Sequence, residues 1–220
     1  EVLMLQLRRA EKDFVLRQDI KYLTSFDATV NKISLLISSL KNGLINTDIP
    51  MGKTSSIGPD INTYQNTFKQ LVDESLVKGL DKNSGSYGKL RNATHELETF
   101  LASVNNLQAQ VYLLTLRRYE KDFMLRNDEK YVAELIAVAQ RLDGLLTDTR
   151  SKQLLATYLF EFKSFVTTSK KIGLDFTSGI QGDLRTVIHI VEEDLTTEIQ
   201  RINQHVEDKR SSNQLISILV

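Results

Sequence analysis

The sequence predicts an all-α fold, and three observations support this prediction. Apolar residues recur at helical spacings of three and four along most of the chain, whereas the alternation typical of strands is almost absent. Only 2 of the 220 residues are proline and 10 are glycine, so long helices can run with few interruptions. Finally, blocks from the first half of the chain recur in the second half, which is typical of tandem helical units.

Two blocks make up this repeat. Residues Leu7–Tyr22 read LRRAEKDFVLRQDIKY and residues Leu116–Tyr131 read LRRYEKDFMLRNDEKY, with 12 of 16 positions identical at a constant offset of 109. Residues Gly79–Glu98, GLDKNSGSYGKLRNATHELE, recur at an offset of 94 as Gly173–Glu192, GLDFTSGIQGDLRTVIHIVE. Charged residues are copied along with apolar ones, so the repeat bears on function as well as on packing.

This duplication predicts one domain of 220 residues made of two related units, about 1–109 and 110–220. The first helix is expected to carry a continuous apolar seam: Leu16, Ile20, Leu23, Val30, Ile33, Ile37, Leu40 and Leu44. A polar break follows at 46–59. Pro59 and Asp60 suit the start of a second helix that ends near Leu80.

The third helix is expected to be very long, from about Lys89 to Leu146, since the pair Asn105-Asn106 is its only turn signal. At ~1.5 Å per residue it would span roughly 85 Å, too long for one compact bundle, so we expect it to link two bundles. A fourth helix is expected at about Lys152–Gly173, and a fifth from Gly182 to the C-terminus.

The composition argues against several classes of function. The 28 Lys and Arg balance the 28 Asp and Glu, without a polybasic tract or aromatic residues among basic ones, so nucleic acid is not an expected partner. The absence of cysteine removes thiolate metal sites and cysteine nucleophiles, and suits an oxidising compartment. No nucleophile stands beside an oriented base, so we do not expect an enzyme.

The two ends of the chain suggest a piece of a longer membrane protein. The chain begins at Glu1 without a signal peptide. Its last residues, 214–220, read QLISILV and are uncharged. They are either a frayed helix end that packs on a neighbour or the first turns of a transmembrane helix. If both ends enter one membrane, the number of antiparallel helices is even, and a sixth segment is expected in the connection 44–59.

Charged residues are expected on the core-facing stripe of the first helix and of its copy. Steps of three and four lead back from Leu16 to Asp13 and Arg9, and in the copy from Leu125 to Arg118. A charge on a core stripe is costly unless it is paired or faces a polar cavity. Two interpretations remain open: an Arg–Asp pair inside the bundle, or a cavity in which arginine forks bind an anionic ligand.

The second block places an arginine, a histidine and a glutamate on one helix stripe at i, i+4 and i+7, namely Arg91, His95 and Glu98 and, in the copy, Arg185, His189 and Glu192. A zinc site needs more ligands at tighter spacing, so no metal is expected.

The doubled strings RRxEKDFxLRxDxKY and GLDxxSGxxGxLRxxxHxxE resemble the helical bimodular sensor domain of bacterial methyl-accepting chemotaxis proteins and of some sensor histidine kinases. The resemblance covers nearly the whole chain. It implies a periplasmic domain of an inner-membrane protein, held between two transmembrane helices and built from six helices as two stacked four-helix modules sharing long helices. It also implies a homodimer, with C4-dicarboxylates bound in the membrane-proximal module and acetate in the distal one.

By motif position the resemblance implies arginine contacts to the ligand, and the seam favours Arg9 over its neighbour. The predicted ligand-binding residues are Arg8, Arg9, Asp13, Arg185, Arg201, Arg118 and Arg126. The expected function is a chemoreceptor sensor domain for malate, succinate, citrate or acetate, without a cofactor. The alternatives are a histidine-kinase module that recognises a partner binding protein, and a purely structural spacer.

Overall fold

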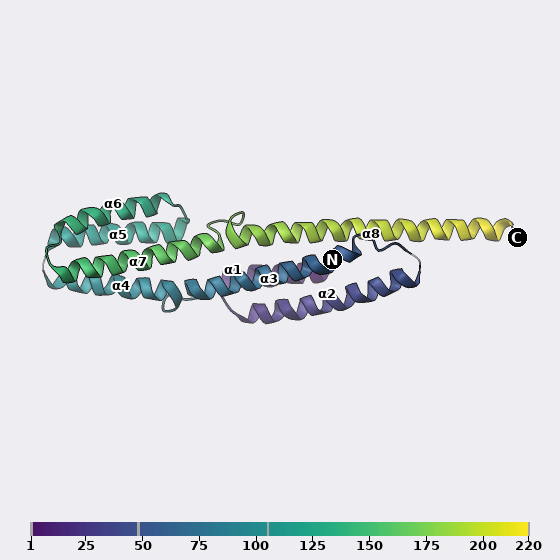
Figure 1. Ribbon diagram of the computed structural model, residues 1–220, viewed down its shortest axis with the longest axis horizontal. Helices are drawn as coiled ribbons and strands as arrows, with labels where there is room; N and C mark the ends of the chain where they lie inside the picture. The colour runs from purple at the N-terminus through teal and green to yellow at the C-terminus, as the bar shows by residue number, and fades with distance from the viewer. Residues whose placement is uncertain (1, 48, 105, 220) are drawn as a thin grey trace. The chain divides into compact units, whose positions relative to one another are not determined.

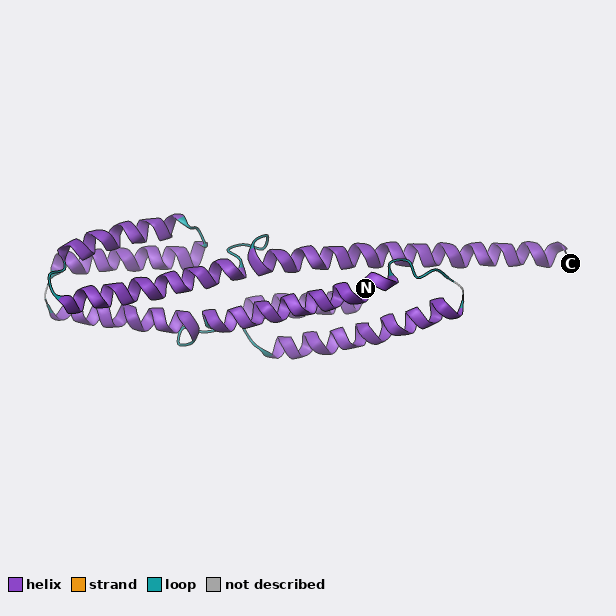
Figure 2. Cartoon of the chain, viewed as in Figure 1, coloured by secondary structure: helices purple, strands orange, loops and turns teal. Residues whose placement is uncertain are grey.

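The computed structural model describes residues 2–47, 49–104 and 106–219, with side chains described up to residue 211. Every regular element in this part of the chain is an α-helix, so the predicted all-α class is confirmed (Figure 2). The helices, labelled in Figure 1, are α1 (Val2–Arg17), α2 (Lys21–Asn46), α3 (Thr54–Lys78), α4 (Gly85–Ser103), α5 (Leu107–Arg126), α6 (Lys130–Leu145), α7 (Thr149–Ile172) and α8 (Gly179–Leu219).

The chain divides into two compact units. Unit 1 comprises Glu1–Gln70 and Asp183–Val220, and unit 2 comprises Leu71–Gly182. These compact units do not coincide with the sequence halves 1–109 and 110–220, because unit 1 combines the start of the first half with the end of the second. Helices α3 and α8 each contribute residues to both units.

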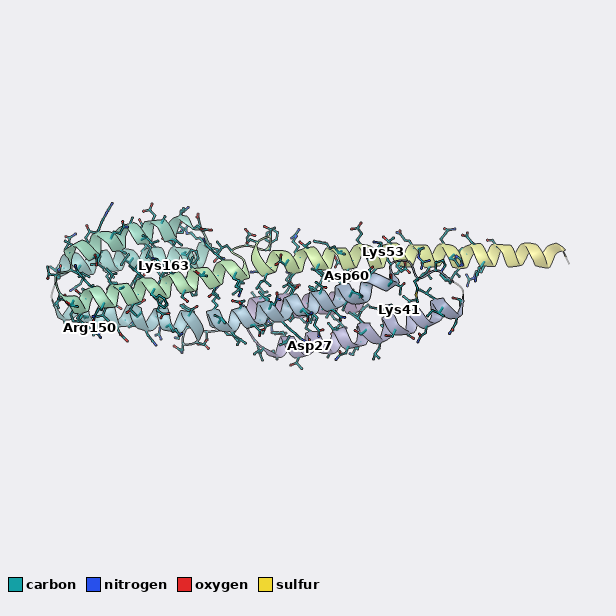
Figure 3. The ribbon with its side chains drawn as sticks, in the orientation of Figure 1. Asp27, Lys41, Lys53, Asp60, Arg150 and Lys163 are labelled. Carbon is teal, nitrogen blue, oxygen red and sulfur yellow. The ribbon has the colours of Figure 1, made fainter. Side chains whose placement is uncertain are left out.

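The core of unit 1 is aromatic and lies between α1, α2 and α3. Phe14 of α1 meets Phe68 of α3 edge to face at 5.7 Å between ring centroids, and Phe26 of α2 lies 4.3 Å from the same ring. At the edge of this core, Gln65 donates to Asp27, labelled in Figure 3, at 2.6 Å. The first three helices of the chain therefore share one core.

Unit 2 has a core of the same kind. Helix α5 packs along α6, and α4 packs along α7. Phe123 of α5 contacts Phe162 and Phe165 of α7 at 5.9 and 6.4 Å between centroids. Phe123 and Phe162 correspond to Phe14 and Phe68 of unit 1 at the two repeat offsets of 109 and 94, so the duplicated sequence builds the same aromatic contact twice.

The predicted continuous first helix is wrong, and so is the predicted helix from Lys89 to Leu146. Gln18 and Asn127, at equivalent repeat positions, both have φ of 52°, and this left-handed residue ends α1 and α5. Asp19 and Asp128 then accept a hydrogen bond from the backbone N–H two residues later, at 3.0 and 2.9 Å. The repeated motif thus encodes a sharp corner between two helices.

Two further helix boundaries differ from those predicted. A break does occur at Asn106, whose side chain caps α5 by accepting from the Ala109 N–H at 3.0 Å; Asn105, the other residue of the predicted pair, lies outside the described residues. Helix α3 begins at Thr54 rather than near Asp60, and Pro59 lies inside it. The additional helices therefore arise from breaks within predicted helices, while residues 47 and 49–53 of the connection form no helix.

The second repeated block forms the turn before α4 and, in its copy, before α8. Gly79 and Gly173 have φ of 105° and 121°, a region open to glycine but strained for other residues. In each turn an aspartate accepts from the backbone N–H two residues later at 2.7 Å, Asp81 in one and Asp175 in the other. Local turn geometry therefore accounts for the glycines and aspartates of this block.

The apolar segment 214–220 lies outside the residues whose side chains are described. Within the described part of the chain, no helix combines the length and apolar character needed to cross a membrane.

We predict opposite effects for alanine at two helical glycines. A Cβ at Gly88 would lie 2.5 Å from backbone atoms of Asn83, so Gly88→Ala should destabilise by roughly 1–3 kcal/mol. A Cβ at Gly43 meets nothing within 4 Å, so Gly43→Ala should stabilise by ~0.5–1 kcal/mol through its higher helix propensity. Urea unfolding measures both, and a Gly88→Ala protein as stable as Gly43→Ala would contradict the turn geometry.

Candidate functional site

The strongest candidate site is a polar pocket of about 260 Å³ within unit 2. Residues from α4, α5 and the turn before α4 line it: Lys82, Tyr87, Arg91, Thr94, His95, Arg117, Glu120 and Lys121. Four of these side chains are cationic at neutral pH and one is a carboxylate. The pocket therefore carries a net positive charge, which suits an anion of small size.

Each arginine of the pocket is oriented by a hydrogen bond. Arg117 Nη1 lies 2.7 Å from Glu98 Oε1 of α4, and both side chains are about one-third exposed. Arg91 Nη1 donates to Asn83 Oδ1 at 3.0 Å. Because each of these contacts occupies one edge of a guanidinium that has five N–H donors, other donors remain for a ligand carboxylate.

Glu120 is the one buried charge of this pocket, with an exposure of 2%. Its Oε1 forms an ion pair with Lys121 Nζ at 2.8 Å. Next to it, the buried Tyr158 hydroxyl of α7 has no hydrogen-bond partner. Burial, and then the negative charge of Glu120, raise the pKa of Tyr158 well above its ordinary value, so the phenol stays protonated.

Unit 1 holds the same arrangement of side chains with different contacts. Glu11, the counterpart of Glu120, is buried and accepts from both the Tyr64 hydroxyl and Lys12. Arg8, the counterpart of Arg117, lies 2.9 Å from Glu192, the counterpart of Glu98. Here the buried carboxylate has a donor for each oxygen, so the network is closed on itself.

The hollow beside this network of unit 1 is mostly apolar. It measures about 330 Å³ and is lined by Met4, Leu5, Glu192, Leu195, Thr196 and Ile199. Its one carboxylate is already paired with Arg8. Ile188 also stands where unit 2 has Thr94, so this part of unit 1 offers less polar surface.

The seam that pointed to Arg9 and Arg118 is wrong in its helical phase. Leu16 and Leu125, from which it was extended, are 79% and 80% exposed, and Arg9 is 85% exposed. A left-handed residue follows α1 and another follows α5, and each one breaks the helix. The pattern of core-facing residues in α2 or α6 therefore cannot be extended backward into α1 or α5. Arg118 is also exposed, with its guanidinium 4.8 Å from the Tyr119 ring centroid.

The stripe that actually faces the core is shifted by one or two positions. In α1 it runs through Met4, Leu7, Glu11 and Phe14, and in α5 through Leu113, Leu116, Glu120 and Phe123. A charged residue does occur on the core stripe, as expected, but it is a glutamate. The apolar residues of α1 and α5 themselves specify a stripe that includes Glu11 and Glu120. In α5, Arg117 and Lys121 lie beside this stripe.

Two other predicted site residues belong to the corner between helices. Asp13 lies 3.4 Å from Arg17 and 3.7 Å from Arg9. Arg126 lies 3.3 Å from Asp122, the counterpart of Asp13. These pairs span one helical turn next to the left-handed residue. Arg185, on α8, is exposed.

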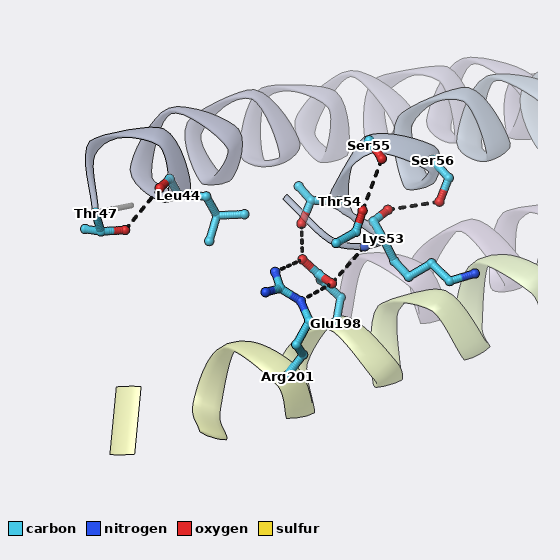
Figure 4. A network of polar contacts seen from close by, with 9 residues as sticks. Leu44, Thr47, Lys53, Thr54, Ser55, Ser56, Glu198 and Arg201 are labelled. Atoms are coloured by element: carbon cyan, nitrogen blue, oxygen red, sulfur yellow. Dashed lines mark hydrogen bonds and ion pairs between the residues drawn. The ribbon is translucent and has the colours of Figure 1, made fainter. Parts of the chain in front are cut away.

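Arg201 is part of a separate network that anchors the start of α3 on α8 within unit 1 (Figure 4). Its guanidinium donates to both oxygens of Glu198, at 2.9 and 2.6 Å. Glu198, 1% exposed, also accepts from the Thr54 hydroxyl and from the Lys53 backbone N–H. The bond from Arg201 does most to lower the pKa of Glu198, to about 2.

The described side chains form no group of three His, Asp or Glu residues suited to a metal ion. A second hollow of unit 2, about 460 Å³, shares His95 with the polar pocket. Its single arginine or lysine is Arg150, labelled in Figure 3. The pocket around Arg91 and Arg117 therefore concentrates more positive charge than this hollow does.

We predict that the Glu198 network stabilises the protein in a pH-dependent manner. In the folded protein the pKa of Glu198 is about 2, below its ordinary value of 4.5. The stabilisation that the ionised carboxylate provides is therefore present above pH 4.5 and is lost as the pH falls toward 2. Glu198→Gln should cost about 1.5–3 kcal/mol at pH 7 and flatten the loss of stability in acid.

The control is Glu207→Gln, which removes an exposed carboxylate bound to Arg210 at 3.1 Å on the same helix. This change should leave the acid dependence unaltered. Urea unfolding at several pH values measures both variants. An equal acid dependence in wild type and Glu198→Gln would refute the assignment.

Comparison of the chain with protein-family models, with curated proteins and with solved structures finds no match.

Proposed function

We propose that this chain is the extracytoplasmic ligand-binding domain of a transmembrane chemoreceptor, and that it binds a small carboxylate in the polar pocket of unit 2. The observation that carries the proposal is the grouping of Lys82, Arg91, Arg117 and Lys121 around a volume of about 260 Å³. Planar guanidinium groups bind carboxylates bidentately, and two of them flank this pocket. The role is binding, without a chemical step.

The pocket is built within one unit, and seven of its eight lining residues lie on α4 or α5, with Lys82 in the turn before α4. Arg117 and Lys121 lie one turn apart on α5, and Arg91 and His95 lie one turn apart on α4. A ligand that bridges them would change the relative free energy of helix positions on α4 and α5, which is how a sensor converts binding into a signal. Contacts from Arg8 and Arg9 to a ligand in unit 1 remain a prediction.

The wider architecture is part of the same proposal. The two compact units would correspond to the two four-helix modules of a helical bimodular sensor, with α3 and α8 as shared helices. Flanking transmembrane segments would hold the domain on the periplasmic face of the inner membrane, as a homodimer. Ligand binding would then shift the equilibrium between signalling states of that dimer.

One observation favours a second candidate, a histidine-kinase module that recognises a partner protein. Leu107, Val111 and Leu114 are all exposed and lie on one face of α5. An exposed apolar stripe of this kind suits contact with a protein surface. A purified domain that responds to no small carboxylate would favour this candidate.

We predict that Arg117 contributes to carboxylate binding and that Arg118, its neighbour, does not. A panel of succinate, malate, citrate and acetate should contain at least one ligand that raises Tm saturably. Arg117→Ala should weaken the affinity for that ligand by about 30-fold, which corresponds to ~2 kcal/mol for a lost charge-assisted contact.

The matched control is Arg118→Ala, because Arg118 is exposed on the same helix. It should bind as the wild type does, and circular dichroism verifies that both variants fold. Unchanged affinity in both Arg117→Ala and Arg91→Ala would place the ligand elsewhere.

A further inference from the structure

The buried carboxylate of the pocket in unit 2 is incompletely satisfied. Oε1 of Glu120 has Lys121 at 2.8 Å, but the partner of Oε2 is the Thr94 hydroxyl at 3.5 Å. That hydroxyl lies 2.7 Å from the Leu90 carbonyl, and a hydroxyl has one hydrogen to donate. Thr94 is thus committed to its own helix, and Oε2 is left without a strong donor.

The equivalent carboxylate in unit 1 shows what is missing. Glu11 has a lysine on one oxygen and the Tyr64 hydroxyl on the other. Tyr158, the counterpart of Tyr64, is fully buried close to Glu120, but its hydroxyl lies outside hydrogen-bonding geometry with that carboxylate. A buried polar group without a partner costs ~1–3 kcal/mol, more if it is charged. Unit 2 therefore retains an acceptor and a donor that unit 1 has paired.

This unsatisfied acceptor lies in the wall of a pocket whose other charged side chains are cationic. A ligand that places a carboxylate against Glu120 would meet like-charge repulsion in a small, partly desolvated volume. A ligand that places an ammonium group there would supply the missing donor as a charge-assisted hydrogen bond. Its carboxylates would still reach Arg91 and Arg117.

We propose that the pocket recognises a small acid that also carries an ammonium group, the simplest class being an acidic α-amino acid. The inference rests on the proposed carboxylate-binding function and specifies its ligand. Two carboxylates and one ammonium group complement four cations and one carboxylate in the lining. A plain polycarboxylate such as citrate leaves Glu120 unsatisfied and crowds it with negative charge.

Ligands that differ only in the ammonium group test this on the unaltered chain. L-Aspartate is succinate with one hydrogen replaced by an ammonium group, and malate carries a hydroxyl at the same position. Isothermal titration at pH 7 should give an affinity for L-aspartate at least ~10-fold above that for succinate, with malate between them.

The outcomes separate the two proposals. Succinate binding as tightly as L-aspartate, or more tightly, overturns the ammonium inference and leaves carboxylate binding intact. If none of the three ligands binds, and acetate and citrate also fail, both proposals are overturned. L-Glutamate and glutarate form a second matched pair for a ligand longer by one methylene.

Glu120→Gln tests the residue itself, since it keeps the shape of the side chain and removes its charge. We expect a loss of at least ~10-fold in affinity for L-aspartate and no loss for succinate. Glu11→Gln, the same change at the equivalent position of unit 1, should leave the ratio of the two affinities unaltered. An equal loss for both ligands in Glu120→Gln would show that Glu120 acts only through the fold. If this variant does not fold, the ligand pairs on the wild-type chain still decide the question.

Discussion

A buried glutamate on the core-facing stripe of α1 and of α5 is the constraint around which both units are organised. Glu11 and Glu120 occupy equivalent repeat positions and are almost fully buried. A carboxylate inside a core costs free energy unless other groups satisfy its oxygens. In unit 1 that requirement links α1 to α3 through Tyr64, and in unit 2 it brings the carboxylate to the wall of a pocket between α4 and α5.

The two units differ in how far the polar network around the buried glutamate is closed. Unit 1 completes its network internally, with Tyr64 on the buried carboxylate and an apolar residue, Ile188, at the position of Thr94. Unit 2 keeps the same scaffold but leaves groups available around a cationic pocket. Both units share their aromatic contacts and helix corners, and these maintain the fold. The hydrogen bonds around the buried glutamate can therefore be complete in unit 1 and incomplete in unit 2.

Local signals predicted the helices where local chemistry decides them. The fourth and fifth predicted helices, about Lys152–Gly173 and from Gly182 onward, agree within a few residues with α7 and α8. They begin or end at glycine turns, or at Asp148, whose side chain caps α7 by accepting from the Ser151 N–H at 2.7 Å. Glycine turns and N-caps depend only on residues close together in the chain, so they can be predicted from the sequence.

The corners were missed because one residue decides each of them. A single left-handed residue, Gln18 or Asn127, interrupts a run of good helix formers, and neither is glycine. A helical phase that is carried across the corner points to Arg9 and Arg118, which are exposed. The apolar residues of α1 and α5 themselves specify the phase that contains Glu11 and Glu120.

The sequence by itself determined the helical class, the duplication, the glycine turns and the presence of charge on a core stripe, since these follow from local propensity and periodicity. Only the tertiary structure decided where α3 begins, because Glu198 supplies the acceptors for Thr54 and Lys53 from a helix more than a hundred residues away. It likewise decided which buried carboxylate is satisfied and which faces a pocket. A hydrogen bond between distant helices depends on how they pack, and no pattern along one helix contains that information.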